Sequence, residues 1–131
     1  MLHPDANVAK MAGGTALSDT DRVPWLHAIA AVMHGWEKAE KSGVVTCSAL
    51  KRVYRNILRG ELSGVRLAYL QGDERTIAGR LAARKGHFMP LALLTSQFSA
   101  LEAPVAEERA LIVHITQSPS VIIAKLAAAF S

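Results

Sequence analysis

Residues 65–81 read VRLAYLQGDERTIAGRL, and this stretch decides the fold class of the chain. The run 65–70 is typical of a β-strand, and the polar residues 71–73 are typical of a turn. Ile77 and Leu81 then recur at helical spacing. A strand that leads directly into a helix is the first half of a βαβ unit.

The same strand-to-helix pattern occurs twice more. Residues 43–47 form a β-branched run, and a helix is expected over 48–59 with Ser48 as its N-cap. Residues 111–115 form a third strand-like run, and a helix is expected over 118–130. This alternation predicts an α/β fold, a parallel sheet covered by helices on both faces in three layers. In such sheets ligands bind at the carboxyl ends of the strands.

Two further helices complete a predicted single domain of residues 1–131. The first begins at a cap at Ser18 or Thr20 and is stopped by Gly43, and the second covers 90–101. The sequence contains no internal repeat and no linker long enough to separate two domains of this size.

The composition excludes several classes of protein. Every apolar run is shorter than the ~20 residues of a membrane-spanning helix, and no secretion signal is recognisable, so we expect a cytoplasmic protein without a membrane partner. Its single cysteine, Cys47, excludes an internal disulfide framework, and no cluster of His and Cys marks a structural zinc site. The net charge of +4 favours anionic ligands such as phosphates.

Residues 47–51 are the first candidate for a functional site. They lie where an expected strand ends and a helix begins, and a helix N-terminus offers unpaired N–H groups and partial positive charge to an anion. Lys51 and Arg55 lie one turn apart on that helix. A simple helix cap beside solvated cations explains the pattern equally well. Cys47 fits a small buried side chain better than a nucleophile, because no partner base is evident.

Arg80 and Arg84 are the second candidate. They lie one turn apart on one helix face, where like charges repel each other unless an anion lies between them. The basic stretch that follows, which includes His87, gives a segment of about residues 80–94 that looks like a mobile lid over a phosphate. An exposed basic helix face is the commoner explanation of such a pair.

The third candidate is the group Asp19, Asp21 and Arg22 near the start of the first long helix. The helix dipole favours acidic residues there, so we interpret the two acids as structural. His27 and His34 are seven residues apart without a suitable carboxylate, and they do not indicate a metal site. The phosphate-cradling motif G-x-x-x-x-G-K-[ST] does not occur in the 131 residues.

A series of short motifs follows in a fixed order: Leu2-His3-Pro4, Asn7, Lys10-Met11, Asp19, Asp21-Arg22, Pro24-Trp25-Leu26, Cys47-Ser48-Ala49-Leu50-Lys51, Tyr54-Arg55, Gly72-Asp73, Arg80-Leu81, Arg84, Gly86-His87-Phe88-Met89-Pro90 and Ser96-Gln97-Phe98. In this order they resemble the blocks of the bacterial gluconokinase family. The resemblance runs from residue 2 to about residue 104 and is weaker beyond.

The resemblance implies a P-loop kinase of the adenylate-kinase-like type. Such a kinase phosphorylates the 6-hydroxyl of D-gluconate with ATP and Mg²⁺ to give 6-phospho-D-gluconate, and the family suggests a homodimer. Family members begin with a strand, a Walker A loop, a helix and a second strand, and this sequence matches them only after these elements. We therefore expect an N-terminally truncated chain that is unstable or repacked, and inactive on its own.

The resemblance also implies roles for individual residues. Lys51 and Arg84 are expected to act in catalysis. The expected gluconate-binding residues are Arg22, Trp25, Ser48, Lys51, Arg55 and His87, the last of them in the lid. The expected nucleotide-binding residues are Arg80, Arg84, Gln117, Ser118 and Pro119.

Two alternatives to a gluconokinase remain. One is a catalytically dead remnant that binds gluconate or an intact kinase partner. The other is a small basic nucleic-acid-binding domain. Nucleic acid is disfavoured as a partner, because the Lys and Arg residues are spread over several helices without an aromatic stacking surface among them.

Overall fold

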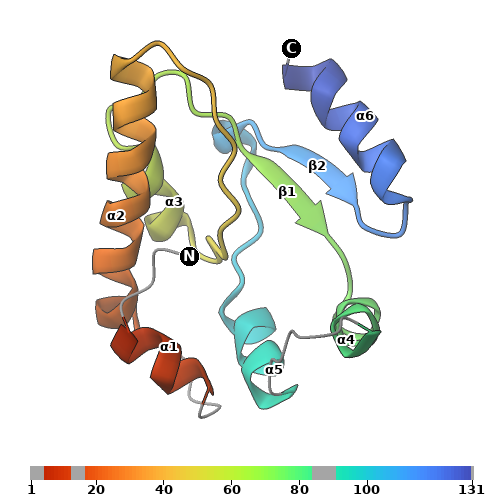
Figure 1. Cartoon of the computed structure of the whole chain (residues 1–131). Coiled ribbons are helices and arrows are strands. Elements are labelled where there is room, and N and C mark those ends of the chain that lie inside the picture. Colours follow the sequence, from red (N-terminus) through yellow and green to blue (C-terminus); the bar gives the residue numbers. More distant parts are fainter. Residues whose placement is uncertain (1–4, 13–16, 84–90, 131) are drawn as a thin grey trace. The chain divides into compact units, whose positions relative to one another are not determined.

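A computed structural model describes residues 5–12, 17–83 and 91–130 of the chain (Figure 1). In chain order its elements are α1 (Asp5–Ala12), α2 (Asp19–Lys38), α3 (Arg52–Arg59), β1 (Ala68–Gln71), α4 (Glu74–Ala83), α5 (Leu91–Ala100), a 3-10 turn (Ala106–Glu108), β2 (Leu111–His114) and α6 (Pro119–Phe130). They form two compact units. The helical unit contains α1, α2, α3 and α5, and the sheet unit contains β1, α4, β2 and α6. None of the described helices is long and apolar enough to cross a membrane.

The sheet unit is built on two parallel strands, which lie side by side in Figure 1 with α6 next to β2. Their register runs from Ala68 opposite Leu111 to Gln71 opposite His114. Val113, on β2, is only 1% exposed. The predicted α/β fold with a parallel sheet is confirmed, and both strands lie within three residues of their expected positions.

The strand expected at residues 43–47 does not form, so that prediction was wrong. The alternation of side chains is nevertheless present, because Val45 and Cys47 pack against the helical core while Val44 and Thr46 are exposed. A strand also requires a neighbouring backbone to accept and donate its hydrogen bonds. Neither described strand pairs with this segment. Of the two predictions for this segment, the burial of Cys47 is therefore confirmed and the strand is not.

The core of the helical unit lies between α2 and α3, which pack against each other. Its buried members are Trp25, Leu26, Ile29 and Tyr54, and Leu26 is completely inaccessible. Trp25 and Ile29 are four residues apart, so both lie on the same face of α2. Leu26 completes the same stripe one residue along.

The N-terminus of α2 is fixed by Asp21 and by α1. Ser18 is the N-cap, as expected, and forms a capping box in which Asp21 N donates to Ser18 Oγ at 3.1 Å and Ser18 N donates to Asp21 Oδ2 at 2.8 Å. Two side chains of α1 bind the same residue: Asn7 Nδ2 donates to Asp21 O at 2.8 Å, and Lys10 Nζ lies 2.7 Å from Asp21 Oδ2. Asp21 therefore holds α1 against the first turn of α2.

The C-terminus of α2 comes earlier than Gly43, the expected stop. Glu40 adopts a left-handed backbone conformation with φ of 56°. Lys41 N donates to Trp36 O at 2.8 Å, and Glu40 N donates to Glu37 O at 3.1 Å. This pair of bonds is a Schellman motif, in which a glycine usually occupies the left-handed position.

The positions of α5 and α6 agree with the helices expected over 90–101 and 118–130. Asp73 caps α4 by accepting a 2.7 Å hydrogen bond from Thr76 N, and hydrogen bonds from Thr76 lower the pKa of the Asp73 carboxyl. In α5, Leu93 and Leu94 are buried. The central part of the lid-like segment, residues 84–90, lies outside the described residues.

Replacing Glu40 with glycine is expected to raise the free energy of unfolding by about 0.5–1 kcal/mol, because glycine reaches the left-handed region without a Cβ clash. The control Glu40→Ala keeps the Cβ and should give no comparable gain. Urea denaturation of the three proteins measures the difference. Equal stability of the glycine and alanine variants would contradict the Schellman assignment.

A second prediction concerns acid stability. Hydrogen bonds, that from Lys10 first, lower the pKa of the Asp21 carboxyl from 3.8 to about 2. Above pH 3.8 the carboxyl is ionised in the folded and unfolded chains alike, and its contribution to stability is complete. As the pH falls towards 2 the unfolded chain takes up the proton first, so the contribution is lost. Urea denaturation across this interval should therefore show a smaller loss for Asp21→Asn than for the parent chain, whereas identical losses would refute the assignment.

Candidate functional site

Three charged side chains gather around Tyr54, where the first turns of α2 lie against the start of α3. We call this group the Tyr54 cluster; its members are Asp19, Arg22, Lys51 and Tyr54. Helix α2 supplies the first two, Lys51 is the N-cap of α3, and Tyr54 lies in the first turn of that helix. The structure thus brings together Arg22 and Lys51, two cations that came from different candidate sites in the sequence.

Asp19 is the anion of the cluster. Its Oδ1 accepts a hydrogen bond from the hydroxyl of Tyr54 and another, at 3.2 Å, from Lys51 Nζ. The bond from Tyr54, followed by that from Lys51, lowers the pKa of the Asp19 carboxyl. The same bond raises the pKa of the Lys51 ammonium, while burial raises the pKa of Tyr54. Asp19 therefore stays ionised and Lys51 stays protonated at neutral pH.

Arg22 is a buried cation with an unsatisfied donor. The residue is 6% exposed, and its guanidinium carbon lies 5.4 Å from the centroid of the Tyr54 ring. Lys51 Nζ lies 5.8 Å from the same centroid. Among the described residues, nothing accepts a hydrogen bond from the buried Arg22 Nε. A buried donor without an acceptor is costly.

One side of the Tyr54 cluster is buried in the core, and the other side is exposed to solvent. Tyr54 is 3% exposed and packs among Trp25 and other residues of the helical core. On the opposite side, the side chain of Asp19 is 61% exposed and that of Lys51 is 30% exposed. Asp19 and Lys51 therefore form the solvent-exposed side of the cluster.

The start of α3 differs from the prediction. Ser48 is not the N-cap, because the helix begins at Arg52. Arg55 explains the delay: its Nη1 donates to the carbonyls of Ala49 at 2.9 Å and Leu50 at 3.2 Å, which holds this segment in a non-helical turn. Arg55 is thus a structural clamp of the segment that carries Lys51.

An acidic side chain of this chain already occupies the N-terminus of α3. Arg52 N donates to Glu102 Oε1 at 3.0 Å, and Glu102 N donates to Leu50 O at 2.7 Å. This helix end was a candidate anion site in the sequence. The Glu102 carboxylate takes the position that a ligand anion would occupy there.

Trp25 and Cys47 are packed side chains of the helical unit. Trp25 is 3% exposed and is a core residue, so its part in gluconate binding stays a prediction. Burial raises the pKa of the Cys47 thiol to about 11, which the charge of Arg22 only partly offsets. A thiol with so high a pKa is a poor nucleophile at neutral pH, in agreement with the interpretation of Cys47 as a packed side chain.

The expected nucleotide residues belong to the sheet unit. Gln117, Ser118 and Pro119 follow β2 at the carboxyl edge of the sheet, and Ser118 Oγ accepts a hydrogen bond from Val121 N at 3.4 Å. The side-chain oxygen of Gln117 is buried without a hydrogen-bond partner in the described part of the chain. Arg80 is exposed on α4. Arg84 and His87 lie outside the described residues.

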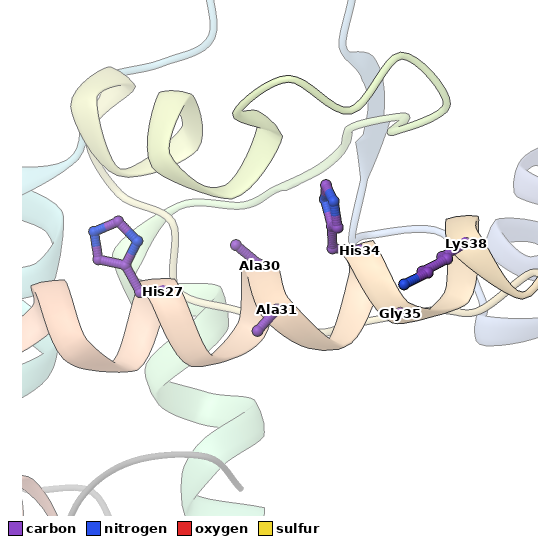
Figure 2. A pocket seen from close by; sticks show the side chains of 6 residues that line it. All are labelled: His27, Ala30, Ala31, His34, Gly35 and Lys38. Carbon is purple, nitrogen blue, oxygen red and sulfur yellow. The ribbon is translucent and has the colours of Figure 1, made fainter.

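A depression of about 430 Å³ lies against α2 and is lined by His27, Ala30, Ala31, His34, Gly35 and Lys38. Figure 2 shows these residues along the helix. His27 and His34 are two helical turns apart, or about 10 Å, which is too far to share one metal ion. Within residues 5–12, 17–83 and 91–130, no three His, Cys, Asp or Glu side chains are grouped so that they could hold a metal. The depression therefore offers no chemistry comparable to the Tyr54 cluster.

Two members of the cluster, Tyr54 and Asp19, were not predicted to be site residues. Tyr54 was not singled out for a role, and Asp19 was interpreted as a structural acid at the start of its helix. A signal was nevertheless present, because Asp19 and Arg22 are three residues apart, as are Lys51 and Tyr54. Side chains at this spacing share a helix face, so each pair could have been considered as a unit.

No family model matches the sequence. The chain is 46% identical over 111 residues to the thermosensitive gluconokinase of Escherichia coli (strain K12), with 85% of this chain and 59% of that protein covered. It is 43% identical over 129 residues to a gluconokinase of Gluconobacter oxydans (strain 621H), with 95% of this chain and 70% of that protein covered. The crystal structure of a gluconokinase from Sinorhizobium meliloti 1021 matches it with a TM-score of 0.86 at 40% identity, over 98% of this chain and 72% of that one.

The chain thus spans about three fifths to seven tenths of the length of these relatives. The match nevertheless includes nearly all of its own residues, in sequence and in fold. The chain belongs to the gluconokinase family.

Proposed function

We propose that the chain serves the reaction of its family, the ATP-dependent phosphorylation of D-gluconate to 6-phospho-D-gluconate, and that gluconate binds at the Tyr54 cluster. The observation that carries the proposal is the buried Nε of Arg22, a charged donor that no described residue satisfies. The names of the relatives support the same substrate.

A sugar acid suits the chemistry of the cluster. Its carboxylate is a monoanion that can accept a charge-assisted hydrogen bond from Arg22 and attract Lys51. Its hydroxyl groups are donors, and the exposed Asp19 carboxylate has acceptor capacity beyond the two bonds made by Oδ1. A neutral sugar would offer the buried Arg22 Nε no charged acceptor.

ATP is the proposed second substrate, bound by Arg80, Arg84, Gln117, Ser118 and Pro119, with His87 in the lid. The buried side-chain oxygen of Gln117 supports this, because it is an acceptor suited to the exocyclic amino group of adenine. Lys51 and Arg84 are the proposed catalytic cations, since phosphoryl transfer depends almost wholly on positioning and on stabilising negative charge. A homodimer is also proposed, on the resemblance to the family alone.

Mg²⁺, when bound, would neutralise charge on the β- and γ-phosphates. The described residues provide no group of three or more acidic or imidazole ligands for it, and it usually binds through one or two carboxylates together with phosphates and water. We therefore assign the ion no ligand in this part of the chain. Arg22, Lys51 and Asp19 bind and orient the sugar acid.

Replacing Arg22 with lysine tests the binding site. Lysine keeps the charge but lacks the Nε donor and the planar geometry, so the Kd for D-gluconate should rise roughly tenfold to hundredfold. Isothermal titration calorimetry measures this, with Arg75→Lys, an exposed arginine of α4, as the matched control. An unchanged Kd in the Arg22 variant would remove Arg22 from the site.

Turnover tests the kinase activity of the 131 residues by themselves. The sequence contains no Walker A motif to cradle the phosphates, so gluconate phosphorylation should be slower by many orders of magnitude than that of the Escherichia coli thermosensitive gluconokinase. A coupled assay of ADP release under identical conditions measures both proteins. Comparable turnover would show that phosphate positioning does not depend on that motif here.

A further inference from the structure

The side chain of Tyr54 contacts three charged residues. Its ring lies within 6 Å of two cations, Arg22 and Lys51, and its hydroxyl donates to the carboxylate of Asp19. A single residue therefore touches both proposed gluconate-binding cations and their counter-ion.

The hydroxyl group is not needed for packing. Tyr54 is buried against Trp25, Leu26 and Ile29, and the ring of a phenylalanine would fill the same space. A buried tyrosine hydroxyl must find a polar partner, and here it finds Asp19. The role of the hydroxyl is therefore to hold the Asp19 carboxylate in place.

Asp19 would be poorly fixed without that bond. Its side chain is 61% exposed, and its other contact is the 3.2 Å bond from Lys51, whose flexible side chain is itself 30% exposed. An exposed pair of this kind holds its geometry weakly because both side chains lose rotamer freedom by pairing. The buried Tyr54 anchors the pair to the core.

We propose that Tyr54 is a positioning residue, whose hydroxyl orients Asp19 and through it Lys51, while its ring holds the Arg22 guanidinium in the geometry that a sugar acid requires. This inference rests on the proposed gluconate site. Tyr54 acts through its neighbours and does not itself contact the substrate. Its effect should therefore appear in the affinity for gluconate and vanish where Asp19 has already been removed.

The experiment is a double-mutant cycle in the 131-residue chain, with Tyr54→Phe, Asp19→Asn and the double variant, and with the Kd for D-gluconate measured by calorimetry. Tyr54→Phe keeps the ring and should weaken binding roughly tenfold. The double variant should bind no more weakly than Asp19→Asn alone, because Tyr54 acts through Asp19. Additive losses would indicate a purely structural role and would overturn the proposal.

The chain offers a matched control, because Tyr69 on β1 is its only other tyrosine. Tyr69→Phe should leave the Kd unchanged. In that background Tyr54 is the sole tyrosine, so an ultraviolet titration follows its ionisation alone. Its pKa should lie above the ordinary value, and Asp19→Asn should lower it, since the hydrogen bond to the Asp19 carboxylate contributes to the rise.

The outcomes separate this inference from the proposed function. If the parent chain does not bind gluconate, both are wrong. If the parent chain binds gluconate, Arg22→Lys weakens binding and Tyr54→Phe does not, only the positioning role is wrong. If Tyr54→Phe fails to fold, the titration in the Tyr69→Phe chain still decides, because a Tyr54 pKa that does not respond to Asp19→Asn would overturn the proposal.

Discussion

The contact of α2 with α3 through Tyr54 is the constraint on which the rest of the helical unit depends. The ring is part of the apolar core with Trp25 and Leu26, while the hydroxyl lies among charged groups at the edge of that core. Packing in the core fixes the position of the Tyr54 ring. The hydrogen bond from its hydroxyl then fixes the exposed carboxylate of Asp19. The polar site is thus ordered by the same residue that closes the core.

Much of the fold could be predicted from the sequence because local pattern and tertiary structure agree there. The cap at Ser18, the strands around residues 68 and 111 and the helix that starts at Pro119 follow from short-range preferences that packing leaves intact. Residues 43–47 show the limit of this argument. Their alternating burial is a property of the segment, whereas strand pairing is a property of two segments, and only the first can be read from one of them.

Two residues of the candidate site could be predicted from the sequence. Arg22 and Lys51 were identified as candidates by their positions near helix starts and by the family resemblance, and the structure places both at the ring of Tyr54. Tyr54 and Asp19 were missed because each also satisfies an ordinary structural pattern, an apolar helix face and an acidic first turn. Glu102 lies 50 residues from Arg52 in the sequence, and no local signal shows that its carboxylate caps α3.

The state of Arg22 distinguishes a binding site from a structural charge network. Arg55 is equally buried, yet its guanidinium donates to two carbonyls and holds the turn before α3. Arg22 is held by the ring of Tyr54 and leaves Nε without an acceptor among the described residues. An apolar side chain would fill that position at lower cost, because a buried cation requires compensation. The carboxylate of the proposed gluconate ligand would supply that compensation.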